Sequence, residues 1–193
     1  MKTLKAKKTI ALLMTAAMLC GFGGCIGDNN TGSNTNSGGN SPAIANNDER
    51  TPDWFIFNTV DLYGNKVSHE TFADKDIVIV YNWGTWCPPC VNGMPDTAKL
   101  VKEYGDRVGF LALVDDFASK SDQIKKIVEN VDMPKEFIMV DPHIKELSSI
   151  YSEINVTGAL PTSMWVYKGV AEEPLVQTPA KFKERLDDYF AKV

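Results

Sequence analysis

The feature that most constrains this chain is an apolar run that leads directly into two cysteines three positions apart. Residues 77–81, Ile-Val-Ile-Val-Tyr, are mostly β-branched and uncharged, which is typical of a strand buried on both faces of a sheet. Cys87 and Cys90 follow, separated by two prolines. Because proline is tolerated in a first helical turn, the sequence predicts a helix from Pro88 to about Tyr104. The cysteines are therefore expected at a strand-to-helix junction.

Strand-like and helix-like segments alternate around this junction and predict one α/β domain spanning residues 51–193. Pro95 is expected to kink the helix that carries the cysteines. Beyond that helix the pattern predicts a buried strand at 108–114 and then a helix with an apolar stripe through Ile124 and Val128. A short strand at 137–140 and a helix near 144–151 are expected next. The chain is expected to end with a hairpin, whose strands lie at 162–167 and 174–177, and a last helix from Pro179.

A Cys-x-x-Cys pair at a strand-to-helix junction suits thiol–disulfide exchange. Unpaired N–H groups and the helix dipole favour a thiolate at Cys87, and the thiolate is the nucleophile in that reaction. Cys90 lies one turn further on, where it can attack the mixed disulfide and release the partner. Pro88 and Pro89 stiffen the turn and remove two N–H donors that could stabilise the thiolate.

Two other interpretations of the cysteine pair stay open, namely half of a zinc site and an inert structural disulfide. Zinc would need two further ligands, and His69 and His143 are the only histidines in the chain. A domain of 143 residues can bury an adequate core without a disulfide. The sequence thus favours a redox-active pair, with no metal and no cofactor.

The N-terminus has the pattern of an export signal. Four lysines precede an apolar stretch of secretory length, so residues 1–24 are predicted to be a signal peptide. The small residues Gly23 and Gly24 before Cys25 resemble a bacterial lipobox, which implies that Cys25 becomes lipidated, although a plain cleaved signal is the alternative. Residues 25–50 are rich in Asn, Gly and Ser and are predicted to be a flexible linker between the lipid anchor and the domain.

The charge of the chain argues against a nucleic-acid partner. The four lysines of the signal segment leave 16 basic against 25 acidic residues, a formal net charge of −9. No Lys/Arg run or basic stripe with interleaved aromatic residues follows residue 24, so the electrostatic footprint of phosphate binding is missing. A moderately acidic surface is explained by solubility.

The cysteine motif sits within a longer block that resembles a known family. Residues 81–90, Tyr-Asn-Trp-Gly-Thr-Trp-Cys-Pro-Pro-Cys, and the following Met94-Pro95 resemble the active-site block of thioredoxin-like proteins of the TlpA/ResA type, relatives of the AhpC/TSA redoxins. Residues 54–66 resemble the N-terminal hairpin of that family, residues 114–116 its next strand end, and residues 160–162 its cis-proline loop. The resemblance covers the chain from about Thr51 onward.

This resemblance implies a thioredoxin fold, a central mixed sheet flanked by helices, with an added N-terminal β-hairpin. It implies a redox-active Cys87–Cys90 disulfide and a cis peptide bond at Pro161, lying against Cys87. The Leu160 backbone and the adjoining Thr162 are then expected to bind the substrate strand, with Trp86 as an exposed contact surface. The alternative interpretation of Pro161 is an ordinary turn proline that precedes a strand.

Two positions depart from the family pattern. Relatives often carry an acidic residue three after the second cysteine, where this chain has Gly93, and thioredoxins carry a buried Asp six before the first cysteine, where it has Tyr81. The usual proton acceptors are therefore missing. We assign Asp115, Asp116 and Glu153 no role as substitute acceptors, since acidic residues near strand ends are commonly solvated. His69 and His143 are expected to be surface or capping residues. By strand alternation Trp83 is expected in the core.

The leading functional hypothesis is an extracytoplasmic reductase, anchored to the bacterial cell membrane by its N-terminal lipid. Its expected partners are oxidised exported proteins, as in cytochrome c maturation or protein repair, with a membrane thiol relay of the CcdA or DsbD type as electron donor. A disulfide-forming oxidase is the nearest alternative. A thiol peroxidase is disfavoured because peroxiredoxins carry Thr three residues before the reactive cysteine, where this chain has Gly84, and a metallochaperone is the non-enzyme alternative.

Overall fold

The structure is a computed structural model that describes residues 51–192. The signal segment, the linker and Cys25 lie outside these residues, so their assignments stay predictions. Among the described residues, none of the helices has the length and apolar character needed to cross a bilayer.

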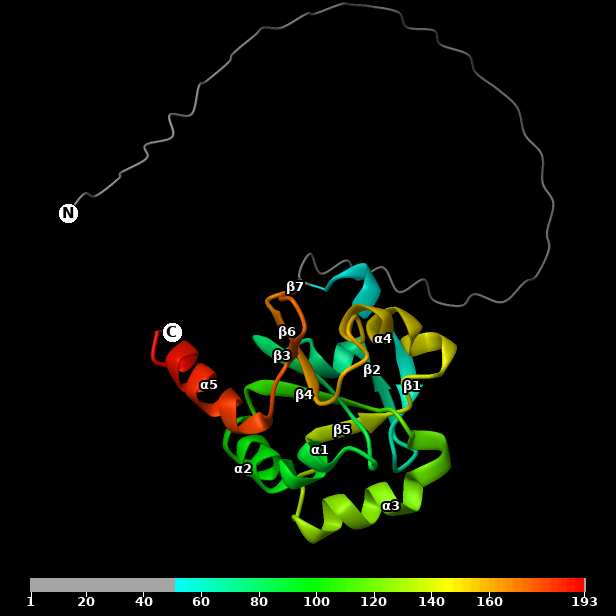
Figure 1. Ribbon diagram of the computed structural model, residues 1–193. Helices are drawn as coiled ribbons and strands as arrows, with labels where there is room; N and C mark the ends of the chain where they lie inside the picture. The colour runs from blue at the N-terminus through cyan, green and yellow to red at the C-terminus, as the bar shows by residue number, and fades with distance from the viewer. Residues whose placement is uncertain (1–50, 193) are drawn as a thin grey trace, which may run out of the picture. The chain divides into compact units, whose positions relative to one another are not determined.

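A mixed sheet forms the centre of the domain, with strand order β5-β4-β3-β6-β7 (Figure 1). Strands β3, β4 and β5 run parallel, β6 runs antiparallel to β3, and both β7 and β8 pair with the outer edge of β6. The strands span β3 Ile77–Trp83, β4 Val108–Val114, β5 Phe137–Val140, β6 Thr162–Tyr167, β7 Val170–Ala171 and β8 Leu175–Val176. A separate antiparallel hairpin, β1 Asn58–Val60 and β2 Lys66–Ser68, lies at the predicted N-terminal position.

The helices cover both faces of the sheet, as the apolar runs in β3 and β4 require. Every residue of these two strands is buried. One face packs against α1 Pro88–Asn92, α2 Met94–Tyr104, α3 Phe117–Asn130 and α5 Phe182–Phe190, and the other against α4 Ser148–Ile154 and the N-terminal segment. Short 3-10 turns complete the order at Asp53–Phe55, His69–Phe72, Lys145–Leu147 and Pro179–Lys181.

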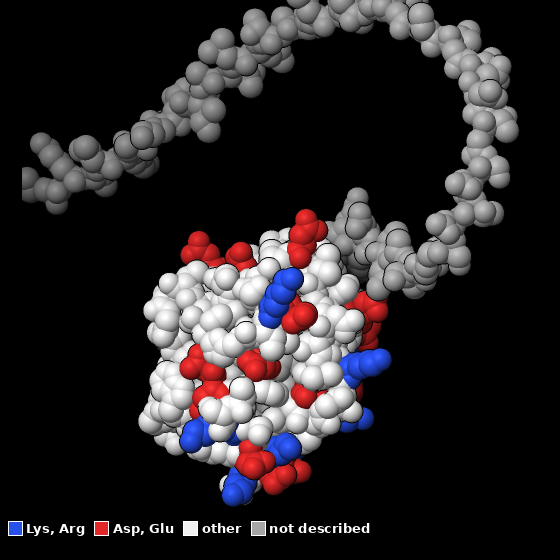
Figure 2. Space-filling view, turned by 90° about the vertical axis from the view of Figure 1, so that its right-hand side faces the viewer, with Lys and Arg blue, Asp and Glu red and all other residues white. Residues whose placement is uncertain are grey.

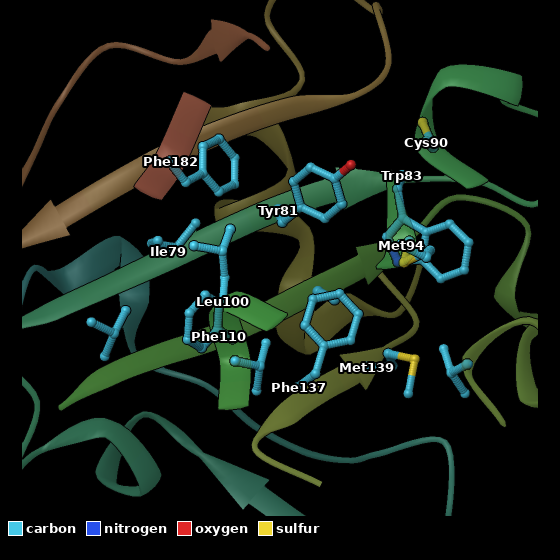
Figure 3. Close-up of a cluster of buried hydrophobic side chains, with 14 of the residues drawn as sticks. Ile79, Tyr81, Trp83, Cys90, Met94, Leu100, Phe110, Phe137, Met139 and Phe182 are labelled. Carbon is cyan, nitrogen blue, oxygen red and sulfur yellow. The ribbon is translucent and has the colours of Figure 1, made fainter. Parts of the chain in front are cut away.

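The core under the cysteines is built from alternate residues of β3. Ile79, Tyr81 and Trp83 face the side on which Cys90 and the helices lie (Figure 3). Trp83 has no exposed surface, which confirms its predicted core position. Because β-strand side chains alternate, this face is fixed by the same register that brings Trp83 to the end of the strand.

The helix after the cysteines is divided rather than merely kinked. The sequence predicted one helix with a bend at Pro95, but α1 ends at Asn92 and α2 begins at Met94, on either side of Gly93. Pro95 has no N–H to donate and its ring clashes with the carbonyl four residues earlier, so the hydrogen-bond ladder stops there. Thr97 restarts the ladder by donating its N–H to the Gly93 carbonyl at 3.0 Å.

The described chain begins at the edge of the sheet where β3 starts. Thr51 and Pro52 line a small hollow together with Asp76, which directly precedes β3, and Lys168 of the β6–β7 turn. This position lies beside β7 in Figure 1. Cys87, by contrast, follows the other end of β3.

Charged side chains are dispersed over the surface. The face in Figure 2 carries basic side chains singly or near acidic ones, with uncharged surface between them. Several pairs are exposed, such as Lys99 with Asp96 and Lys192 with Asp188. Exposed pairs of this kind contribute at most about 1 kcal/mol each to stability.

Candidate active site

Cys87 and Cys90 form a disulfide at the strand-to-helix junction that the sequence predicts. Their sulfur atoms lie 1.99 Å apart and their Cα atoms 5.2 Å apart. Cys87 is the N-cap of α1, four residues after the end of β3. The junction therefore holds the pair at the edge of the sheet where the parallel strands end.

The two cysteines differ from their neighbour in exposure. Cys87 is 2% exposed and Cys90 is 0% exposed, whereas Trp86 is 59% exposed. A partner protein that approaches the disulfide therefore meets Trp86 first. Both cysteines are buried, and Cys87 is the one next to Trp86, which is the position predicted for the attacking cysteine.

Among residues 51–192, one backbone donor serves the Cys87 sulfur. The Cys90 N–H donates to Sγ of Cys87 at 3.3 Å. Pro88 and Pro89 occupy the first two helical positions, where an N-cap side chain would otherwise find a further N–H. The helix terminus thus offers the sulfur one donor instead of the usual larger set.

The predicted cis-proline loop lies beside the same edge. The Leu160–Pro161 peptide bond is cis, as the family resemblance implies. Thr162 pairs with Asn82 of β3, so the loop enters the sheet near the end of the strand that leads to the cysteines. The Pro161 carbonyl accepts the Gln177 N–H at 3.2 Å, while no backbone partner within residues 51–192 binds Leu160. The role of the Leu160 backbone in binding a substrate strand stays a prediction.

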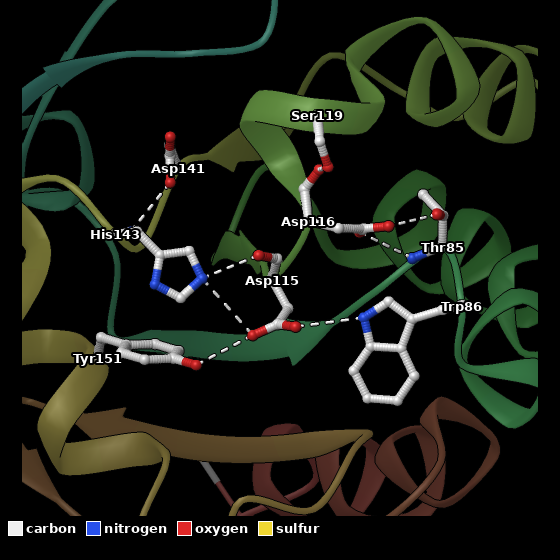
Figure 4. Close-up of polar contacts among 8 residues, drawn as sticks. All are labelled: Thr85, Trp86, Asp115, Asp116, Ser119, Asp141, His143 and Tyr151. Atoms are coloured by element: carbon white, nitrogen blue, oxygen red, sulfur yellow. Dashed lines mark hydrogen bonds and ion pairs between the residues drawn. The ribbon is translucent and has the colours of Figure 1, made fainter.

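Two acidic residues have contacts that the sequence analysis missed. Asp115 accepts hydrogen bonds from Trp86 Nε1 at 3.2 Å and from the Tyr151 hydroxyl at 3.0 Å (Figure 4). Asp116 accepts from the Thr85 N–H at 3.0 Å and also from the Thr85 hydroxyl. The sequence analysis expected these residues to be solvated at a strand end, whereas both accept hydrogen bonds from the loop before Cys87. Glu153 is exposed on α4.

The histidines occupy different places. His143 Nε2 lies 2.8 Å from the Asp115 carbonyl oxygen and 3.6 Å from its carboxylate. The ring therefore belongs to a polar cluster with Asp115, Trp86 and Tyr151, and not simply to the surface. His69 Nδ1 lies 3.2 Å from the Phe57 carbonyl, next to the N-terminal hairpin. A sequence signal for the cluster existed, since Asp115 and Asp116 follow β4 and residues after neighbouring parallel strands meet at one edge of the sheet.

Tyr81 and Gly93 stand where the family often has acids. Tyr81 is 2% exposed, and burial raises the pKa of its hydroxyl far above the usual range. The phenol is therefore neutral under ordinary conditions and does not accept the proton of a cysteine. A side chain at Gly93 would meet Pro179 Cδ at 3.3 Å, so the last helix closes over this position.

Gly84 provides the space in which the Trp86 indole lies. A Cβ atom at position 84 would come within 2.8 Å of Trp86 Nε1, closer than real contacts allow. We expect Gly84→Ala to displace the indole and break its bond to Asp115, with the free energy of unfolding changed by less than about 1 kcal/mol because Trp86 is exposed and can move.

The measurement for Gly84→Ala is hydrogen exchange at the Trp86 indole N–H, followed by NMR. Trp86→Phe identifies the signal, and the buried Trp83 indole is the internal reference. Faster exchange at Trp86 alone is expected, and an unchanged rate would contradict the role assigned to Gly84.

Together, the mixed sheet, the Cys87–Cys90 disulfide at a helix start and the adjacent cis-proline define a thioredoxin-like thiol–disulfide oxidoreductase. The Redoxin family model matches residues 39–156, and the chain belongs to this family, among its TlpA/ResA-like thiol–disulfide oxidoreductases.

Three proteins illustrate the similarity. The thioredoxin-like protein YneN of Bacillus subtilis is 29% identical over 72% of this chain and 78% of its own length. The thiol-disulfide oxidoreductase ResA of Bacillus cereus is 30% identical over 71% and 74%. The solved structure of Etrx1, an exposed lipoprotein thioredoxin of Streptococcus pneumoniae, has 21% identity, a TM-score of 0.53 and coverage of 69% and 98%. This last likeness concerns the fold and confirms the predicted fold class.

Proposed function

We propose that this protein works outside the cytoplasm as a reductase of disulfides in exported proteins. In this proposal the reduced Cys87 attacks a partner disulfide and Cys90 resolves the mixed disulfide. The partners would be oxidised exported proteins, such as those handled in cytochrome c maturation or repair. A membrane thiol relay of the CcdA or DsbD type would return the protein to its dithiol form.

The main observation in favour of a reductase is that few hydrogen-bond donors reach the Cys87 sulfur. Within residues 51–192, the Cys90 N–H is the one group that donates to it, at 3.3 Å. A strong oxidant is one whose reduced form is stabilised, and here missing donors oppose a thiolate. The dithiol therefore gives up electrons readily.

The proposed location rests on the N-terminal sequence. The export signal, the lipobox-like Gly23-Gly24-Cys25 and the polar segment at 25–50 support a lipid anchor at Cys25. Etrx1, which shares the fold, is an exposed lipoprotein. Anchoring to the same membrane as a thiol relay would raise the effective concentration of one for the other without new contacts.

The first test is the reduction potential of the Cys87–Cys90 pair, measured from tryptophan fluorescence of the protein in defined thiol/disulfide buffers. A midpoint near or below about −250 mV, in the range of thioredoxin, is expected. A midpoint near about −120 mV, the range of strong oxidants, would make the protein a disulfide donor and would reject the reducing direction.

A peroxidase is less compatible with the site. Peroxiredoxins carry Thr at the position of Gly84, and any β-carbon there would collide with the Trp86 indole at 2.8 Å. In the loop before Cys87, the Trp86 indole therefore occupies the space in which a peroxidase places its threonine hydroxyl.

A further inference from the structure

We propose that Asp115 is a positioning residue that fixes two walls of the partner-binding surface relative to each other. One wall is the Trp86 indole beside Cys87, and the other is the segment that leads from α4 to Leu160. The proposal rests on the proposed action on protein disulfides and is independent of the direction of electron transfer.

The first wall is held by Asp115 from the end of β4. Trp86 is 59% exposed, so packing alone leaves its indole free to change rotamer. Its Nε1 donates to Oδ2 of Asp115 at 3.2 Å, and the lack of a side chain at Gly84 lets the ring lie close to the backbone. The indole is thereby kept in one orientation before a partner arrives, which lowers the entropy lost on binding.

The second wall is held through Tyr151. The Tyr151 hydroxyl donates to Oδ1 of Asp115 at 3.0 Å. Tyr151 belongs to α4, which ends at Ile154 and continues through the Asn155–Ala159 segment into the cis Leu160–Pro161 bond. The same carboxylate therefore binds, through separate oxygens, the Trp86 indole from the loop before Cys87 and the Tyr151 hydroxyl from α4 (Figure 4).

The protonation states suit this arrangement. Burial and the neighbouring Asp115 carboxylate raise the pKa of Tyr151 to about 12, so its hydroxyl remains a donor at neutral pH. His143, from the loop between β5 and α4, faces Asp115 at 3.6 Å from the carboxylate and 2.8 Å from the carbonyl. The T-shaped packing of His143 on Tyr151, with ring centroids 5.0 Å apart, braces the cluster from a third segment.

The chemistry of Asp115 distinguishes two substitutions. Asp115→Leu removes both acceptors. Asp115→Asn keeps one oxygen for the Trp86 N–H, and its amide can donate to the Tyr151 hydroxyl, which accepts as well as donates. The amide therefore preserves both contacts, and a positioning role predicts that Asn rescues what Leu loses.

The test compares a protein disulfide with a small one. The reduced full chain is mixed with insulin or with oxidised glutathione, and thiol release is followed. In either reaction the Cys87 thiolate attacks one sulfur and expels the other as a thiolate. The Cys90 thiolate then attacks the Cys87 sulfur, breaks its bond to the substrate and expels the second substrate thiolate, so the chain is oxidised and the substrate disulfide is reduced by two electrons.

For Asp115→Leu we expect the second-order rate constant with insulin to fall about 10-fold, because misplaced contact groups lower the chance of reaction, and that with glutathione to change less than about 2-fold. Asp115→Asn should stay within about 3-fold of the parent with both substrates. Asp122→Leu, the same change at an exposed acid on α3, is the matched control and should leave both rates unaltered.

A double-mutant cycle with Trp86→Ala separates positioning from stability. If Asp115 acts through Trp86 and Tyr151, Asp115→Leu adds to the insulin defect of Trp86→Ala only the smaller loss that Tyr151→Phe adds, well short of its full effect in the parent. Equal losses with both substrates, or additive losses in the cycle, would overturn the proposal. Tyr151→Phe, which removes one hydroxyl and keeps the ring, should show a smaller selective loss even if Asp115→Leu folds poorly. The reduction potential should be the same in all variants, so a high midpoint would reject the reductase while leaving this test intact.

Discussion

A Cys90→Ser chain should accumulate as a mixed disulfide with its protein partners, whereas Cys87→Ser should form none. Cys90 is completely enclosed, while Cys87 is the N-cap residue next to the exposed Trp86. Partners therefore reach Cys87, and without the Cys90 thiol the covalent intermediate has no internal route to release.

The measurement is mass spectrometry of the adducts formed with insulin, separated under non-reducing conditions. The Cys87→Ser, Cys90→Ser chain is the control for non-covalent binding. Adducts on Cys87→Ser in amounts similar to those on Cys90→Ser would reverse the assigned roles. Steady turnover by either single variant would show that another group carries the exchange.

Pro89→Ala should raise the reduction potential by roughly 30 to 65 mV. The substitution restores an N–H at the second helical position, where it can donate to the Cys87 thiolate beside the Cys90 N–H already 3.3 Å away. A hydrogen bond to a charged group contributes about 1.5–3 kcal/mol, and about 30 mV corresponds to 1.4 kcal/mol for a two-electron couple. The reduced form is stabilised, so the protein becomes a weaker reductant.

Pro88→Ala is the matched control for this effect. It also replaces a proline in the first turn, but the N–H at the first helical position is not one that an N-cap side chain usually binds. Its midpoint should therefore move much less. Equal shifts for both variants would assign the effect to backbone stiffness, and no shift for Pro89→Ala would remove the physical basis for the reducing direction.

The fold could be predicted because its key segments carry strong local signals. The run at 77–81 has no charge and many β-branched residues, and it became β3 at the centre of the sheet. The division of the next helix at Gly93 was harder to place. Pro95 signals a disturbance, but the position of the break also depends on Thr97, whose side chain donates to the Gly93 carbonyl at 3.0 Å.

The polar cluster could be predicted only in part. Asp115 after β4 and His143 after β5 follow neighbouring parallel strands and so lie at one edge of the sheet. Asp115 was expected to be solvated there, however, and nothing local marks Tyr151 as its partner. These contacts depend on how α4 and the β5–α4 loop pack against the end of β4. Gly84 is similar, since the need for glycine arises from the indole two residues later and not from a turn conformation.

The first described residue and the disulfide lie at opposite ends of β3. Residue 51 adjoins the start of β3, and the disulfide follows its far end, so a seven-residue strand of about 20 Å separates them. In the proposed function, residues 25–50 would tether the domain to a membrane at Cys25. A coil of about 25 residues has a mean reach of roughly 25–30 Å, more than the length of that strand. The length of such a tether would then decide whether the disulfide can reach a thiol relay in the same membrane.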